Sequence, residues 1–399
     1  MYLTHLSLTN FRIFSRLDED IPQGALILLG DNAQGKTSLL EAIYLLSSMT
    51  SIQATTSAEL INFSATKDDL AVSRIKANYV RGDREHRLEV RIIQEASSNG
   101  NNHVRKEVLL DGQKTKLNSA VGHFNAVLFL PHMLEIITGS PRQRRQYMDL
   151  VLAQVVPQYS SVLSDYNKAI SQRNPLLKQL KERGGDPDQL AYWDEKITQT
   201  GAKIIHARIQ ALSELENQAA NIHHDLTRGK EILRLRYQPG YEPLPIPSGQ
   251  FNLPLEVPVD RSGISLENIQ IGFRNKLLEL REEEIKRGLT TIGPHRDELH
   301  FLGNGIDLGK YGSRGQVRIT LLALKMAEVG WIKEKIGHWP VLLLDEILAE
   351  LDETRRQDLL ERLAQTEQVI LTSTGLDLFT TEFSQEAAQW HIEEGRLTT

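Results

Sequence analysis

The chain has 399 residues, a formal net charge of −6 and no cysteine. This length gives room for about two or three domains, and 40% hydrophobic with 25% charged residues is ordinary for a soluble globular protein. The lack of cysteine excludes disulfide frameworks, thiolate zinc sites and thiol nucleophiles. No apolar run approaches the ~18 residues that span a bilayer, and the N-terminus lacks a secretory signal. We therefore expect an unprocessed cytoplasmic protein that does not act on membranes.

Residues 30–37, Gly-Asp-Asn-Ala-Gln-Gly-Lys-Thr, match the P-loop pattern G-x-x-x-x-G-K-S/T in full. The apolar run 25–29 predicts a buried strand ahead of the loop, and residues 38–46 have the composition and spacing of a helix behind it. The glycines let backbone N–H groups turn around phosphate oxygens, and the helix start adds a favourable dipole. Lys36 has the charge to bind the β and γ phosphates, and Thr37 has the hydroxyl to ligate Mg²⁺. The predicted nucleotide-binding residues are Gly30, Asp31, Asn32, Ala33, Gln34, Gly35, Lys36, Thr37 and Ser38.

Further strands are predicted on both sides of the P-loop. Alternating apolar and polar residues predict a sheet with one solvated face, whereas short continuous apolar runs predict buried strands. Asp111 and Gly112 carry the signal of a hairpin turn, and the polar residues 97–102 predict a loop. The predicted strands are residues 3–14 at a sheet edge, 70–80, 87–93, 126–130, 341–344 and 368–371.

A helical region follows the first group of strands. Residues 140–143, Ser-Pro-Arg-Gln, form a helix start with an N-cap, a proline at the first position and a capping box. Apolar residues at a spacing of three or four over 147–170 predict a long helix bent at Pro157. The Gly-Gly-Asp-Pro run at 184–187 predicts a sharp turn, and the same periodicity resumes over 190–226. We therefore expect an antiparallel helical hairpin with its tip near residues 184–187.

The remaining segments indicate how the domains are organised. The proline-rich residues 239–258 predict a linker, and residues 265–287 predict a helix that ends at a glycine. The predicted organisation is an ATPase domain in two parts, residues 1–141 and 289–399, split by a mainly helical insertion over 142–288.

Asp345 and Glu346 follow the apolar run 341–344. A P-loop protein needs an acid at such a strand end to hold Mg²⁺, which assigns that role to Asp345. Glu346 is suited to act as general base toward the attacking water. Residues 313–316, Ser-Arg-Gly-Gln, precede a predicted helix at 317–328, and small residues at such a point form a second anion site. A buried strand that merely ends in two acids, and a plain loop before a helix, are the alternative interpretations.

The order of these motifs is similar to that of an ABC-type ATPase head. Within that superfamily the chain resembles the RecF family of bacterial recombinational repair proteins. The Gly-Pro-His-Arg-Asp segment at 293–297 separates this family from SMC heads, whose coiled coils are far longer than the hairpin predicted here. The resemblance implies an α/β fold, an ABC-type P-loop ATPase head with an inserted, mainly α-helical second domain. The residues that carry the resemblance are 8–12, 35–44, 139–141 with Arg144 and Arg145, 293–297 and 312–316.

The resemblance also implies how the motifs are used. Such heads dimerise around ATP and Mg²⁺, with the signature of one copy acting in trans on the nucleotide of the other and Asp352 in a D-loop. Hydrolysis by a weak, DNA-stimulated ATPase, with Lys36 and Glu346 as catalytic residues, then opens the dimer. The family binds double-stranded DNA and single/double-strand junctions, and works with RecR and RecO-type mediators to load a recombinase. The signature residues expected to act in trans are Ser313, Arg314, Gly315 and Gln316.

Three departures from the family pattern point to slow turnover. Ala33 stands where the family usually has glycine, His132 stands where it usually has an acid, and residues 372–374, Thr-Ser-Thr, lack the histidine of typical ABC heads. Two other functions stay open. One is a P-loop phosphotransferase that acts on a small molecule, and the other is a scaffold that holds ATP as a structural ligand.

Arg142, Arg144 and Arg145 lie in the first turns of a predicted helix, where positive charge opposes the helix dipole. They are candidate DNA contacts, and a local ion pair, for example with Asp149, is the default interpretation. A net charge of −6 argues against uniform attraction to nucleic acid but leaves room for a local basic patch. Contacts of this kind would be to phosphates and therefore sensitive to salt.

Overall fold

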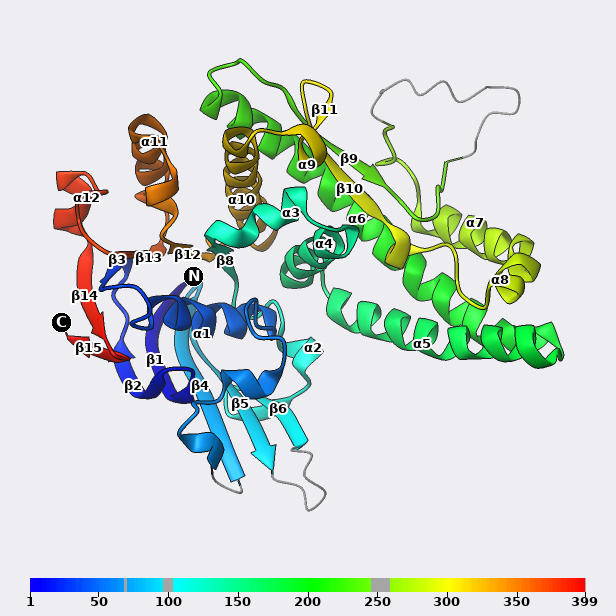
Figure 1. Cartoon of the computed structure of the whole chain (residues 1–399), viewed down its shortest axis with the longest axis horizontal. Helices are drawn as coiled ribbons and strands as arrows, with labels where there is room; N and C mark the ends of the chain where they lie inside the picture. Colours follow the sequence, from blue (N-terminus) through cyan, green and yellow to red (C-terminus); the bar gives the residue numbers. More distant parts are fainter. Residues whose placement is uncertain (68–69, 96–102, 245–258, 399) are drawn as a thin grey trace. The chain divides into compact units, whose positions relative to one another are not determined.

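The computed structural model of the chain describes residues 1–67, 70–95, 103–244 and 259–398. It divides into two compact units (Figure 1). The first unit is Met1–Met133 with Glu328–Thr399, and the second is Leu134–Ala327. The second unit contains the predicted insertion, whose limits at 142 and 288 stay a prediction. The loop predicted at 97–102 and most of the predicted linker at 239–258 lie outside the described residues.

A six-stranded sheet forms the centre of the first unit. Its order is β15-β14-β3-β13-β12-β8, and all neighbours pair in parallel except β15 with β14. Every residue of β8, β12 and β13 is buried, which confirms the buried strands that the apolar runs predicted. The strands are β3 (Gly24–Leu29), β8 (Ala126–Phe129), β12 (Val341–Asp345), β13 (Gln368–Ser373), β14 (Ala388–Glu393) and β15 (Arg396–Thr398).

A second sheet of the first unit is antiparallel, with the order β2-β1-β4-β5-β6-β7. The strand predicted at 3–14 is present as β1, but its end and its edge position are wrong, because the chain turns back after Phe11 and β1 lies between β2 and β4. Only Phe14 and Leu17 of β2 are buried, so its sequence has too little alternation to predict a strand. Asp111 and Gly112 both have positive φ and form the predicted hairpin turn. The strands are β1 (Tyr2–Phe11), β2 (Phe14–Asp20), β4 (Leu70–Arg81), β5 (Arg84–Glu95), β6 (His103–Leu110) and β7 (Gln113–Thr115).

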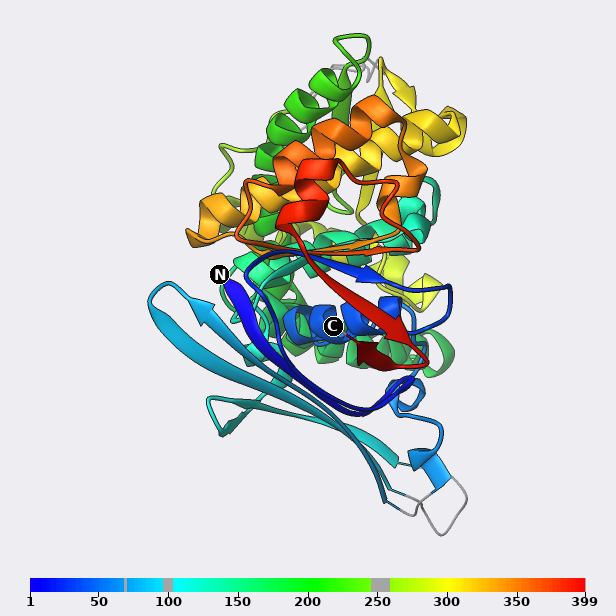
Figure 2. The same ribbon diagram turned by 90° about the vertical axis from the view of Figure 1, so that its left-hand side faces the viewer.

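Helix α1 (Lys36–Ser48) lies between these two sheets (Figure 2). It packs against β8, β12 and β13 on one side and against β4 and β5 on the other. All of its residues except Thr37 and Ser38 are buried, because both flanks of the helix face a sheet. The other helices and turns of this unit are α2 (Leu117–Ala120), α11 (Glu353–Leu363), α12 (Thr381–Glu386) and the 3₁₀ turns Ser57–Leu60, Ala65–Lys67 and Ile347–Glu350.

The second unit is mainly helical. Its core is an antiparallel hairpin of α5 and α6, joined through the predicted turn and the 3₁₀ turn Pro187–Leu190. A three-stranded sheet, β11-β10-β9, lies against α6. The elements are α3 (Glu135–Thr138), α4 (Pro141–Val155), α5 (Tyr159–Arg183), α6 (Ala191–Leu226), β9 (Leu233–Gln238), α7 (Leu266–Glu279), α8 (Arg281–Arg287), β10 (Glu298–Gly303), β11 (Ile306–Asp307), α9 (Leu308–Tyr311) and α10 (Arg314–Ile336), which ends in the first unit.

The structure corrects two predicted helices and confirms their caps. The single bent helix across Pro157 is wrong: α4 ends at Val155 and α5 begins at Tyr159, because Gln158 has a φ of 62° and proline has no N–H to continue the helix. The helix predicted at 265–287 is divided into α7 and α8 at Leu280. The predicted capping box of α4 and the glycine end of α8 are confirmed.

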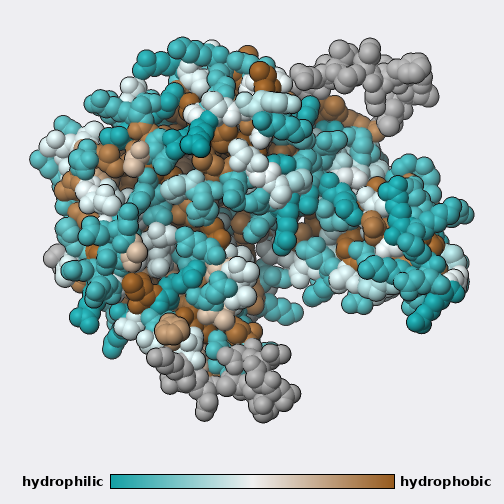
Figure 3. All heavy atoms as spheres, viewed as in Figure 1, coloured by the Kyte–Doolittle hydropathy of each residue, from teal (hydrophilic) through white to brown (hydrophobic). Residues whose placement is uncertain are grey.

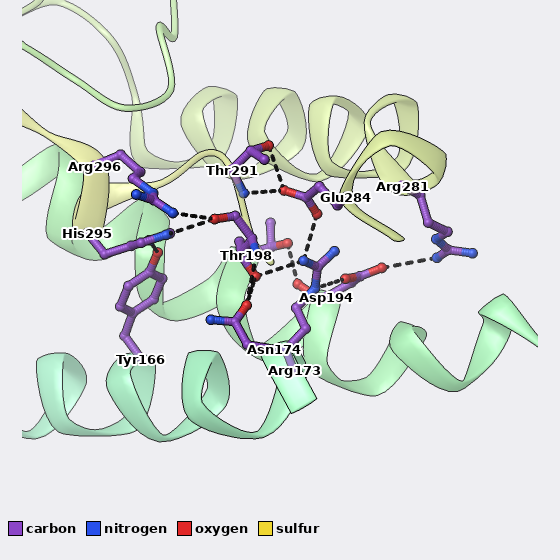
Figure 4. Close-up of polar contacts among 11 residues, drawn as sticks. Tyr166, Arg173, Asn174, Asp194, Thr198, Arg281, Glu284, Thr291, His295 and Arg296 are labelled. Atoms are coloured by element: carbon purple, nitrogen blue, oxygen red, sulfur yellow. Dashed lines mark hydrogen bonds and ion pairs between the residues drawn. The ribbon is translucent and has the colours of Figure 1, made fainter. Parts of the chain in front are cut away.

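A buried network of charged residues joins three helices of the second unit (Figure 4). Arg173 on α5 is fully buried and contacts Asp194 on α6 at 2.8 Å and Glu284 on α8 at 2.6 Å. Arg281 contacts the second carboxylate oxygen of Asp194 at 3.1 Å. Because each buried charge has an opposite partner, the network ties α5, α6 and α8 together without leaving an isolated charge.

The Gly-Pro-His-Arg-Asp segment at 293–297 supplies a second buried centre. The carboxylate of Asp297, which is fully buried, accepts hydrogen bonds from Arg208 at 2.6 Å and from the hydroxyl of Tyr237 at 2.5 Å. The backbone N–H of Gly240 donates a third, at 2.6 Å. This segment therefore links α6, β9 and β10, which gives the sequence motif a structural role.

The face drawn in Figure 3 is mainly hydrophilic, as the composition of a globular protein predicts, with apolar residues scattered between the hydrophilic ones. No helix among the described residues is long and apolar enough to cross a membrane.

Candidate nucleotide-binding site

The P-loop joins β3 to α1 at the carboxyl end of β3. Gly30 and Gly35 have φ of 150° and 114°, in the region that favours glycine. A Cβ on Gly30 would lie 2.4 Å from the carbonyl oxygen of Ile392, so no side chain fits there. Ala33 also has positive φ, 65°, a left-handed conformation that glycine adopts with less strain than alanine.

Lys36, the first residue of α1, points its ammonium back to the loop. The Nζ donates hydrogen bonds to the carbonyl oxygens of Gly30 at 2.6 Å and Asp31 at 3.2 Å. It also lies 3.3 Å from the Oε1 of Glu346. Only 4% of the Lys36 side chain is exposed, so the ammonium is held in place by these oxygens.

Thr37 and Asp345 meet where β3 and β12 end. The hydroxyl of Thr37 donates a 2.8 Å hydrogen bond to Oδ2 of Asp345. The other carboxylate oxygen, Oδ1, accepts a 2.7 Å hydrogen bond from the hydroxyl of Thr372 on β13. Both oxygens of Asp345 are therefore oriented by threonine hydroxyls, one from the first turn of α1 and one from β13, which pairs with β12.

Glu346 follows β12 in a left-handed conformation, with a φ of 50°. Its N–H donates a 3.0 Å hydrogen bond to the Thr372 hydroxyl oxygen, which fixes this unusual backbone. Its side chain is 40% exposed and lies beside Lys36, where it can reach a water. Thr372 thus contacts both acids, a role that sequence reasoning missed. The signal was a threonine at the end of a strand that pairs with the strand carrying the acids.

The Thr37 and Asp345 side chains fit Mg²⁺. This ion prefers oxygen ligands and takes few of them from protein when phosphates and waters supply the others. The described residues contain no group of three or more acidic or histidine side chains that would hold a metal by themselves.

The C-terminal hairpin supports the loop. The side-chain Oε1 of Gln34 accepts a 2.6 Å hydrogen bond from the N–H of Glu394, and its carbonyl oxygen accepts one of 3.1 Å from Gly395. Glu394 and Gly395 form the turn between β14 and β15, where both have positive φ. Sequence reasoning did not identify this support, because the turn lies 360 residues from Gln34.

The predicted signature begins α10. Ser313 and Gln316 form a reciprocal capping box: Gln316 N donates to Ser313 Oγ at 3.2 Å, and Ser313 N donates to Gln316 Oε1 at 2.9 Å. Ser313, Arg314 and Gly315 are exposed. A Cβ on Gly315 would meet no atom within 4 Å, so the chain's own packing does not require glycine there. Asp352 has a capping role too, since it accepts a 3.1 Å hydrogen bond from Arg355 N at the start of α11.

The three candidate DNA-binding arginines differ in their surroundings. Arg144 forms a bidentate ion pair with Glu298, 154 residues away, at 2.6 and 3.0 Å, so the predicted ion pair exists but is not local and does not involve Asp149. Asp149 instead contacts Arg208 at 2.7 Å. Arg145 donates to the carbonyl oxygen of Asp297 at 2.8 Å, and burial lowers the pKa of its guanidinium. Arg142 is exposed.

The whole length of the chain matches known proteins. A family model described as RecF/RecN/SMC N terminal domain matches residues 2–390. The DNA replication and repair protein RecF of Roseiflexus castenholzii is 38% identical over 100% of this chain and 99% of its own length. The protein of the same name from Bacillus subtilis is 34% identical over 100% of both chains. The chain belongs to the RecF family.

Two solved RecF structures share the fold. One, described as the recombination mediator protein RecF-ATP in the RecFOR pathway, has a TM-score of 0.80 and 30% identity, and covers 100% of this chain and 97% of its own. The other, described as RecF-ATPrS, has a TM-score of 0.81 and 31% identity over 99% and 97%. The predicted fold class is therefore confirmed: the chain has the α/β ABC-type ATPase fold of RecF, with a helical insertion.

Proposed function

We propose that this chain is an ATP-dependent DNA repair protein that binds Mg-ATP at the P-loop and hydrolyses it slowly. One observation carries the proposal. Lys36, Thr37, Asp345 and Glu346 come from two distant parts of the sequence and meet at one edge of the parallel sheet. The names of the relatives, DNA replication and repair protein RecF, and the RecF structures described with ATP support it.

Each residue has a role that follows from its contacts. The Lys36 ammonium lies at the loop, where phosphate oxygens would replace the carbonyl oxygens that now hold it. Thr37 and Asp345 would hold Mg²⁺, which when bound neutralises charge on the phosphates. Glu346 would accept a proton from the attacking water, since its carboxylate is exposed beside Lys36.

The exposed glycine of the signature, Gly315, supports the proposal that the signature acts on the nucleotide of another copy. Glycine within a helix is less favourable than alanine by up to about 1 kcal/mol. Gly315 has open space around it, so this cost brings no advantage inside the chain. A closely approaching ligand explains it, and we propose that this ligand is the nucleotide of a second copy. Two copies would then enclose two nucleotides, with Asp352 near the contact.

We further propose that the ATP-bound dimer binds double-stranded DNA and single/double-strand junctions, and acts with RecR and RecO-type mediators in loading a recombinase. The family name and the RecFOR pathway of the solved relatives support this part. Arg142 is the arginine of the three with an exposed side chain, and it stays a candidate DNA contact. The insertion over 142–288 stays the proposed second domain.

The decisive experiment is the solution mass of Glu346→Gln with Mg-ATP and with Mg-ADP, measured by light scattering. Blocked hydrolysis should trap the closed state, so we expect a dimer with ATP and a monomer with ADP. Glu361→Gln, an exposed carboxylate on α11, is the matched control and should behave as the unmodified chain. A monomer in both nucleotides would contradict the dimer. Unchanged hydrolysis in Glu346→Gln would show that Glu346 is not the general base.

A further inference from the structure

The amide of Gln316 is engaged at both ends within its own chain. Its Oε1 accepts a hydrogen bond from Ser313 N at 2.9 Å, and its Nε2 donates to Oε1 of Glu231 at 2.9 Å. Ser313 and Gly315 are exposed, whereas Gln316 is partly buried. The signature therefore has an outward part, Ser313 to Gly315, and an inward part, Gln316.

Glu231 lies in the connection between α6 and β9, 85 residues before Gln316. Its second carboxylate oxygen lies 3.8 Å from Nε2 of His223, a fully buried residue in the last turn of α6. Thr320, one turn after Gln316 on α10, lies with its hydroxyl 3.4 Å from the same nitrogen. Two successive turns of α10 thus make polar contacts with this region: Gln316 contacts Glu231 in the connection, and Thr320 contacts His223 in the last turn of α6.

The orientation of the Gln316 amide depends on this carboxylate. A glutamine side chain can exchange the positions of its oxygen and nitrogen by rotation, and only one of the two orientations closes a capping box on Ser313 N. Glu231 accepts but cannot donate when ionised, so it selects the orientation in which the nitrogen faces it and the oxygen faces Ser313. Burial lowers the pKa of His223, which disfavours a protonated histidine that would pair with the Glu231 carboxylate in place of Gln316.

We propose that Glu231 is a positioning residue of the signature: it holds Gln316 inward so that Ser313 and Gly315 face the nucleotide of a second copy. Gln316 then supports the signature and does not touch the nucleotide. The inference rests on the proposed function, because it needs a dimer in which the signature acts in trans. Sequence reasoning had no access to it, since Glu231 belongs to no motif.

The first test compares Glu231→Ala with Glu231→Gln. The alanine variant should bind ATP as the unmodified chain does, because its P-loop is intact, but should hydrolyse it about tenfold more slowly. Glutamine keeps an acceptor oxygen and should restore most of the rate. Glu267→Ala, an exposed carboxylate in the first turn of α7, is the control and should change neither quantity. Normal turnover in Glu231→Ala would overturn the inference.

The second test places the defect in cis or in trans by mixing variants. When Glu231→Ala is mixed with Lys36→Met, mixed dimers combine an intact P-loop from one chain with an intact signature from the other, so hydrolysis should recover. When the double variant Glu231→Ala/Lys36→Met is mixed with the unmodified chain, each mixed site has one defect, and activity should come only from unmodified dimers. Recovery in neither mixture would overturn the role in trans.

A third variant keeps the inference testable if Glu231→Ala is poorly folded. Gln316→Leu removes the same hydrogen bond from the other side, together with the acceptor oxygen for Ser313 N, so it should slow hydrolysis at least as much as the loss of Glu231. Normal turnover in Gln316→Leu would overturn the shared contact. The proposed function fails separately: it fails if Glu346→Gln does not dimerise with Mg-ATP, whereas the role of Glu231 alone fails if that dimer forms and Glu231→Ala turns over normally.

Discussion

The hydroxyl of Thr37 donates a 2.8 Å hydrogen bond to Asp345, although 308 residues separate the two in the chain. The contact exists because β3 and β12 lie on either side of β13 in a parallel sheet, so that Asp345 and the first turn of α1, which follows β3, are at the same edge. A hydroxyl and a carboxylate at this point have the chemistry of a Mg²⁺ site for a nucleotide.

Thr37→Val should remove the Mg²⁺ dependence of nucleotide binding. Valine has the shape of threonine but no hydroxyl, so ATP affinity in Mg²⁺ should fall at least about tenfold, or about 1.4 kcal/mol, toward the value in EDTA. Fluorescent nucleotide titrations with and without Mg²⁺ measure this. Thr366→Val is the control, because the Thr366 hydroxyl donates to the carbonyl oxygen of Leu363 at the end of α11 and has no part in the P-loop. An unchanged Mg²⁺ dependence in Thr37→Val would contradict the assignment of Thr37 as a ligand of Mg²⁺.

Ala33 offers a test of backbone conformation in the P-loop. Its φ of 65° costs an alanine about 1–2 kcal/mol, and glycine relieves this strain while losing about 0.5–1 kcal/mol to chain entropy. Ala33→Gly should therefore stabilise the chain by about 0–1.5 kcal/mol. Ala33→Val, which is β-branched, should instead cost roughly 1–3 kcal/mol. Ala33 is exposed, so valine has space and the difference reports the backbone. Thermal unfolding measures the stability of the two variants. Equal stabilities of Ala33→Gly and Ala33→Val would contradict the left-handed conformation of residue 33.

Thr372 should matter for turnover more than for binding. Its hydroxyl donates to Asp345 and accepts from the N–H of Glu346, and both contacts are lost in Thr372→Val. We expect kcat to fall by roughly 10- to 100-fold, since each buried group left without its partner costs about 1–3 kcal/mol. Thr372→Ser keeps the hydroxyl and should recover most of the rate, and the exposed Thr374→Val is the control. A steady-state assay in which serine and valine behave alike would show that the hydroxyl is not used.

His295 predicts a pH dependence of stability. Its Nε2 lies 3.3 Å from the carbonyl oxygen of Thr290 and must donate there, so its unprotonated Nδ1 accepts the 2.6 Å hydrogen bond from the Tyr166 hydroxyl (Figure 4). Burial, and then the neighbouring arginines, lower the pKa of His295 from 6.5 to about 4. The unfolded chain therefore binds the proton more readily between these two values, and stability falls as pH decreases through that window.

We expect the histidine to contribute a loss on the order of 2 kcal/mol between pH 6.5 and pH 4. His295→Gln can make both hydrogen bonds without titrating, so its unfolding free energy should depend less on pH. Urea unfolding across this range measures the slope for both chains. Identical slopes would show that His295 is not the group responsible.

The sequence alone determined those features that neighbouring residues make among themselves. The strand, glycine loop and helix of the P-loop, the capping box at Ser140, the hairpin turn at Asp111 and the helical hairpin were all predicted correctly. Each depends on backbone conformation or periodicity within a short stretch, and residue type limits both. The buried strand that ends at Asp345 was predicted for the same reason.

Only the tertiary structure decided which distant groups become partners. It paired Arg144 with Glu298 and not Asp149, placed Thr372 against Asp345, and joined Gln316 to Glu231. It also put β1 inside its sheet, because a weakly alternating segment became β2 at the edge. Partners of this kind follow from strand order and helix packing, which bring together residues whose separation in the chain carries no information about their distance in space.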